Sequence, residues 1–63
     1  MKTYDEVVAR VANTMFNSHM GGGSKYSSVS NQFGLIAFIF GVTEHQVRND
    51  ADTVFRNLNN GFD

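Results

Sequence analysis

Three consecutive glycines, Gly21 to Gly23, interrupt a chain of 63 residues about one third of the way along. Glycine disfavours a helix because its backbone loses the most conformational freedom on folding. The serine-rich residues that follow extend the interruption, so the sequence predicts a flexible Gly/Ser loop at residues 21–30. Val29 is the one residue of this loop that hints at a contact with the rest of the protein. We therefore expect a single domain in which the second half folds back on the first.

The segment before the glycines has the pattern of an amphipathic helix at residues 3–19. Thr3 and Glu6 have the spacing of a capping box, in which the threonine hydroxyl accepts from the backbone N–H of Glu6 and the glutamate reaches back. Apolar residues then recur at the spacing of one buried helical face: Tyr4, Val7, Val8, Val11, Ala12, Met15 and Phe16.

The stretch from Phe33 to Phe40 is apolar and is compatible with two structures. Ser30 or Asn31 can cap a helix at residues 32–41. The same short run, bounded by glycines and rich in Ile and Phe, also fits a buried strand at residues 35–40. A lone strand needs a partner, so this alternative implies two helices plus one strand in an intertwined dimer.

The third segment, at residues 43–59, is again typical of an amphipathic helix. Thr43 can cap it, and Glu44 suits the positive end of the helix dipole. Its apolar residues lie on one face: Val47, Ala51, Val54, Phe55 and Leu58. The preferred fold is therefore all-α, a three-helix bundle that we expect to be dimeric.

Residues 33–52, FGLIAFIFGVTEHQVRNDAD, have the arrangement of a helix-turn-helix. Ala37 stands where two helices cross closely, and Gly41 stands where the turn needs a left-handed backbone. Val42 follows the turn, and Val47 points inward from the next helix. The segment resembles the helix-turn-helix of bacterial and phage repressors. Within it, GVTEHQVRND resembles the GVS…TIRRD signature of DeoR-class repressors.

This resemblance implies a small DNA-binding transcriptional regulator that acts as a dimer. The helix after the turn would enter the major groove, where Gln46 and Asn49 can pair with adenine and Arg48 with guanine or a phosphate. The other residues expected at DNA are Thr43, His45 and Lys25, each at a phosphate or, for His45, also at a base edge. Asp52 would lie near the DNA backbone and repel it.

The composition limits the other possibilities. A net charge of −1 argues against strong non-specific DNA binding, which depends on cationic surface. The chain has no Cys, and its two His have no third ligand at a metal spacing, so we expect no metal, no cofactor and no enzymatic activity. The absence of Cys and of a long apolar run favours a cytoplasmic protein that does not enter a membrane.

Apolar residues exceed what a monomer of this size readily hides, which points to an interface. The residues expected there are Phe33, Phe38, Ile39, Phe55 and Phe62. The simplest use of that surface is homodimerisation. The alternative to a DNA-binding regulator is a non-enzymatic, dimeric protein-interaction module, such as a phage accessory protein that binds a host factor.

Overall fold

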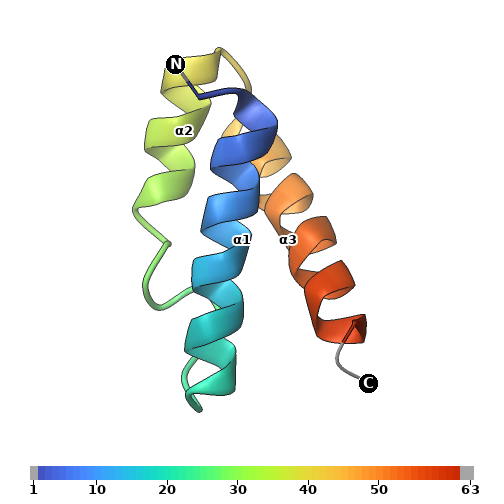
Figure 1. Cartoon of the computed structure of the whole chain (residues 1–63). Coiled ribbons are helices and arrows are strands. Elements are labelled where there is room, and N and C mark those ends of the chain that lie inside the picture. Colours follow the sequence, from blue (N-terminus) through green and yellow to red (C-terminus); the bar gives the residue numbers. More distant parts are fainter. Residues whose placement is uncertain (1, 62–63) are drawn as a thin grey trace.

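The computed structural model describes residues 2–61, which form three helices joined by one long loop and one tight turn (Figure 1). The helices are α1 (Tyr4–Met20), α2 (Gln32–Phe40) and α3 (Glu44–Asn60). Helices α1 and α3 make the most extensive contact, and α2 packs against α3 more than against α1. The chain reverses direction between α1 and α2 and again between α2 and α3. The predicted all-α three-helix fold is confirmed, with helix ends close to those expected.

The alternative with a strand at residues 35–40 is wrong, because this segment lies within α2. Phe33, Ile36 and Ala37 have helical spacing and turn one face of α2 into the core, where they are buried. The segment therefore buries apolar surface within its own chain, and its backbone groups need no partner strand.

Local signals at the ends of α1 explain its length. The Thr3 hydroxyl accepts from the backbone N–H of Glu6 at 3.2 Å, which is one half of the predicted capping box. At the other end, the backbone N–H of Gly21 donates to the Asn17 carbonyl at 3.0 Å. Gly22 follows with a φ of +92°, a conformation that favours glycine and turns the chain away from the helix axis.

The loop after α1 contributes to the core as well as connecting helices. Val29 is fully buried, which confirms the contact expected for it. The Ser18 hydroxyl donates to the Ser24 carbonyl at 2.9 Å and lies 2.8 Å from the Ser27 hydroxyl, so the start of the loop is tied to the end of α1. The core that results combines all three helices with this loop: Val8, Val11, Ala12, Met15, Val29, Phe33, Ile36, Ala37, Val47, Ala51 and Phe55.

Within residues 2–61, no helix is long and apolar enough to cross a membrane.

Candidate nucleic-acid interface

The turn between α2 and α3 has the left-handed backbone that the sequence predicts at Gly41. Gly41 ends α2 in the left-handed region, at φ 68° and ψ 31°. The backbone N–H of Val42 then donates to the Ala37 carbonyl at 3.0 Å, a bond that closes the last turn of α2. Ala37 and Val47 are both buried, so Val47 points inward from α3 as expected. These contacts fix the direction in which α3 leaves the turn.

The first two turns of α3 present a polar surface to solvent. Thr43 caps the helix, and its hydroxyl accepts from the backbone N–H of Gln46 at 3.0 Å. The predicted contact residues of this segment are all exposed: Thr43, His45, Gln46, Arg48 and Asn49. The structure therefore brings five of the six predicted DNA-contacting residues together around the start of one helix.

Aromatic rings orient Arg48 at the edge of this surface. Its guanidinium carbon lies 5.6 Å from the ring centroid of Tyr26 and 5.6 Å from that of Phe33. Both distances are within the range of a cation–π interaction, which restrains the side chain while it stays exposed. Because a restrained guanidinium loses less freedom when it binds, this position favours Arg over Lys for contact with a ligand.

Lys25, the sixth predicted DNA-contacting residue, is engaged within the protein. Its ammonium nitrogen lies 3.2 Å from a carboxylate oxygen of Asp52 and over the rings of Tyr26 and Phe55, at 5.1 and 5.0 Å. Only about a third of the Lys25 side chain is exposed. The ion pair has two consequences: Lys25 is not a free cation for a phosphate, and the charge of Asp52 is compensated locally.

Tyr26 is the central residue of this cluster, and sequence reasoning gave it no role. Its hydroxyl donates to Asp52, and its ring meets that of Phe33 edge-on with 5.8 Å between centroids. Burial raises the pKa of Tyr26, and the hydrogen bond to Asp52 adds to the shift, while Lys25 opposes it. The one available signal was an aromatic residue within a Gly/Ser loop, and that signal names no partner.

A second tyrosine–aspartate pair joins α1 to α3. The Tyr4 hydroxyl donates to Asp50 at 2.6 Å across 46 positions of sequence, and the Tyr4 ring meets Phe40 edge-on at 5.5 Å. Burial, followed by the hydrogen bond to Asp50, raises the pKa of Tyr4 to about 12. The neighbouring Gln46 side chain lowers the pKa of Tyr4 and so opposes part of this rise. Gln46 therefore lies at the side of α3 that faces α1.

The residues predicted to form an interface separate into two groups. Phe33 and Phe55 belong to the core of the single chain, so the expectation that they form an exposed interface is corrected. Phe33 packs against the loop and α3, and Phe55 packs against α1 and the loop. Phe38 and Ile39 are exposed, at 87% and 63%. Phe62 lies outside the described residues.

The titratable side chains do not gather into a metal site in the part of the chain that the structure describes. No group of three or more His, Cys, Asp or Glu side chains there could hold a metal ion. His19 packs edge-on against Phe55 at 5.5 Å, whereas His45 lies exposed in the first turn of α3. The sequence matches no family model, and no curated protein and no solved structure matches it.

Proposed function

We propose that this protein is a small helix-turn-helix DNA-binding regulator, in which the N-terminal half of α3 reads the major groove. The observation that carries the proposal is the left-handed turn at Gly41, followed by a capped α3 whose first two turns are polar and exposed. An α-helix presented in this way fits the width of the major groove.

The side chains on this surface have the donor and acceptor groups that base edges require. Asn49 can bond in a bidentate manner to adenine, and Arg48 to guanine, as the resemblance to repressors implies. The Thr43 hydroxyl accepts from its own helix and can still donate its proton to a phosphate oxygen. Gln46, which faces Tyr4, would need to swing outward to reach a base.

The charges around α3 favour sequence-dependent contacts over non-specific attraction. Arg48 is the only Lys or Arg among residues 43–52, and Lys25 is used to compensate Asp52. Each phosphate that a protein neutralises contributes about 0.9 to the slope of log affinity against log salt. With so few cations, this protein should bind DNA weakly at random sites and show a shallow salt dependence.

The test is selection from a randomised duplex library at low salt, followed by fluorescence anisotropy on the enriched duplex. The variants are Arg48→Ala and Arg56→Ala, which remove the same charge from the same helix inside and outside the proposed site. Enrichment of a short sequence is expected, with Arg48→Ala weakening binding on the order of tenfold and Arg56→Ala changing it little. Amide shifts in an NMR titration should cluster at residues 43–49.

Failure to enrich any duplex, or equal losses from the two arginine variants, would overturn the proposal.

The other candidate function is a non-enzymatic protein-interaction module. The observation that favours it is the exposed apolar surface of α2, where Phe38 has no cover within the described chain. The absence of any DNA response would direct the search to protein partners.

A further inference from the structure

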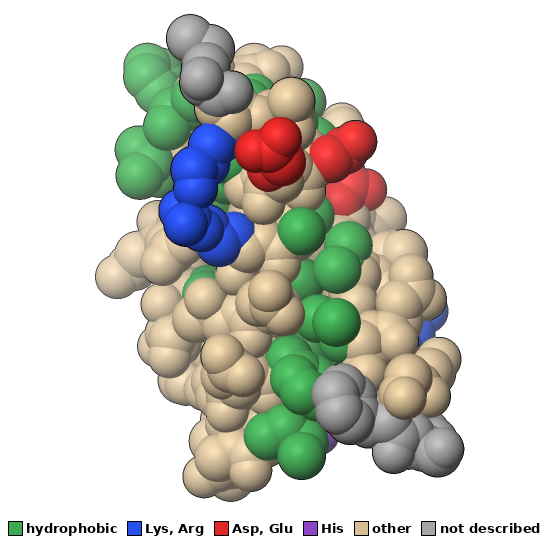
Figure 2. Space-filling view, viewed as in Figure 1, with side chains coloured by type: hydrophobic (Ala, Val, Ile, Leu, Met, Phe, Trp, Pro, Cys, Tyr) green, Lys and Arg blue, Asp and Glu red, His purple; other side chains and the backbone are tan. Residues whose placement is uncertain are grey.

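The outward surface of α2 is apolar where a surface helix is normally polar. Leu35, Phe38 and Ile39 are exposed at 60%, 87% and 63%, and their spacing of three and four residues places them on one stripe. We call these three residues the α2 face. Apolar side chains gather over this end of α2 in the space-filling view (Figure 2). A contiguous apolar surface of this kind usually marks an interface.

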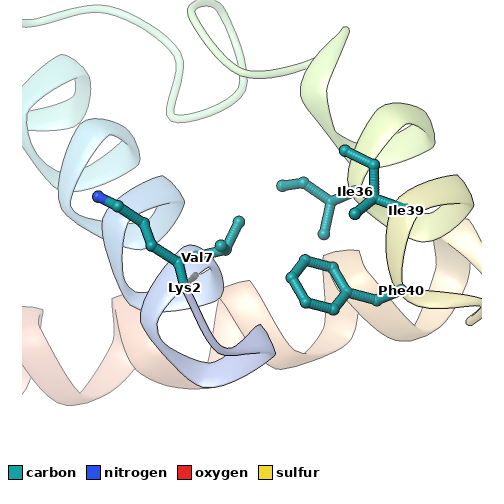
Figure 3. Close-up of a pocket in the computed structure, with 5 residues that line it drawn as sticks. All are labelled: Lys2, Val7, Ile36, Ile39 and Phe40. Atoms are coloured by element: carbon teal, nitrogen blue, oxygen red, sulfur yellow. The ribbon is translucent and has the colours of Figure 1, made fainter.

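An apolar pocket lies directly beside the α2 face. It has a volume of about 480 Å³ and lies between α2 and the start of α1, lined by Lys2, Val7, Ile36, Ile39 and Phe40. The side chains of Ile36, Ile39 and Phe40 face Val7 across it, and the nitrogen of Lys2 points away from them (Figure 3). A cavity of roughly 150 Å³ already holds a benzene molecule, so the pocket can accept a phenyl ring.

The exposed ring of Phe38 and the pocket belong to one surface, because Ile39 is part of both the α2 face and the pocket. At about 100° per residue, Phe38 and the pocket residues Ile36 and Phe40 fall on opposite sides of the ridge formed by Leu35 and Ile39. A two-fold axis that runs along this ridge therefore brings Phe38 of each chain over the pocket of the other.

We propose that two copies of this chain associate through the α2 face, with Phe38 of each copy inserted into the pocket of its partner. The two α2 helices then run side by side in the same direction. A two-fold axis perpendicular to the ridge would instead place Phe38 of one copy against Phe38 of the other. Both pockets would then stay empty.

Charge supports a second copy as the occupant. Lys2 is the only charged residue among those of the α2 face and the pocket, and its ammonium lies at the rim, where it stays hydrated in the pair. No charge is therefore buried without a partner. The surface also offers no pattern of charges by which a foreign protein would be selected, whereas an exposed ring beside an apolar pocket suits a second copy.

The size of the chain sets the expected strength of the pair. A standard interface removes about 800 Å² from each partner, which is roughly a fifth of the 4303 Å² surface of this protein. The exposed ring of Phe38 supplies on the order of 150 Å² of that area. An interface with one aromatic anchor on each side belongs at the weak end of the range, with a dissociation constant around micromolar.

Sedimentation equilibrium without DNA, over roughly micromolar to millimolar protein, tests the pairing separately from the proposed DNA binding. The wild type should shift from monomer to dimer, and Phe38→Ser should remain monomeric with an unchanged circular dichroism spectrum, since Phe38 is exposed in the single chain. Met20→Ser is the matched control, because Met20 is exposed at 65% but lies at the end of α1. It should dimerise like the wild type.

Isotope-filtered NMR on a mixed labelled and unlabelled sample tests the arrangement within the dimer. Contacts between the Phe38 ring of one chain and the methyl groups of Val7 and Ile36 of the other are expected. A wild type that stays monomeric throughout, a dimer that survives Phe38→Ser, or an equal loss with Met20→Ser would overturn the proposal. Contacts from Phe38 to Phe38 in place of the pocket would overturn it as well.

Discussion

The hydroxyl of Tyr26 lies 2.9 and 2.7 Å from the two carboxylate oxygens of Asp52 and thereby fastens the loop after α1 to the middle of α3. Lys25, the neighbour of Tyr26, adds an ion pair to the same carboxylate. The loop is thus held by polar contacts at its surface as well as by the burial of Val29. These contacts also place the Tyr26 ring beneath Arg48, so the position of the proposed DNA contact depends on the loop.

Tyr26→Phe should lower the free energy of unfolding by about 1 kcal/mol. The substitution keeps the ring and removes a hydrogen bond to a charged group, which is worth about 1.5–3 kcal/mol when fully formed and less at a partly exposed position. Urea denaturation followed by circular dichroism measures the change. Ser28→Ala, in the same loop and exposed, is the control. An unchanged midpoint for Tyr26→Phe would show that the bond does not contribute.

Stability should fall at alkaline pH because of Tyr4. An unfolded tyrosine has a pKa of about 10, and the folded protein raises the pKa of Tyr4 to about 12. The unfolded chain therefore loses this proton first. The contribution of the raised pKa is fully present below pH 10 and is lost as the pH rises through about 12.

Denaturation midpoints between these two pH values, together with tyrosinate absorbance in the folded protein, test this dependence. Tyr4→Phe should flatten the part of the pH profile that Tyr4 causes. A profile that is identical in the wild type and in Tyr4→Phe would contradict the assignment to this side chain.

Gly41→Ala should destabilise the protein by about 1 kcal/mol. Gly41 has a φ of +68°, a region that costs an L-residue roughly 1–2 kcal/mol. A Cβ atom at this position would meet nothing within 4 Å, so the whole cost is conformational. Gly41→Asn should lose less, because Asn tolerates the left-handed region better. Thermal denaturation of the two variants gives the order, and equal losses would argue for a steric cause.

Gly34→Ala should have the opposite effect and stabilise the protein by roughly 0.5–1 kcal/mol. Gly34 lies within α2, where Ala is the better helix former. An added Cβ would lie 3.6 Å from Glu44 Oε2, which is an ordinary contact with a flexible side chain. The same denaturation experiment measures the gain. A loss of stability here would mean that α2 and the start of α3 cannot accept a methyl group between them.

The sequence by itself determined where α1 and α3 lie and how they end, whereas it left residues 35–40 open between a helix and a strand. The residues that set the helix ends act on backbone groups within a few positions of themselves, so their effects can be read from a short stretch of sequence. These residues are Thr3, the glycines at 21–23, Gly41 and Thr43. The left-handed turn and the exposed start of α3 follow from these local signals. For that reason the predicted DNA-contacting residues of α3 lie close together in the structure.

Only the tertiary structure decided which side chains meet across the chain. Periodicity could not tell that Phe33 is buried while Phe38, on the same short helix, is exposed, because α2 is apolar nearly all round. It also could not assign Tyr26 to Asp52 or Tyr4 to Asp50, pairs that are separated by 26 and 46 positions. Such contacts depend on how the helices cross, and a pattern of a few residues carries no information about that crossing.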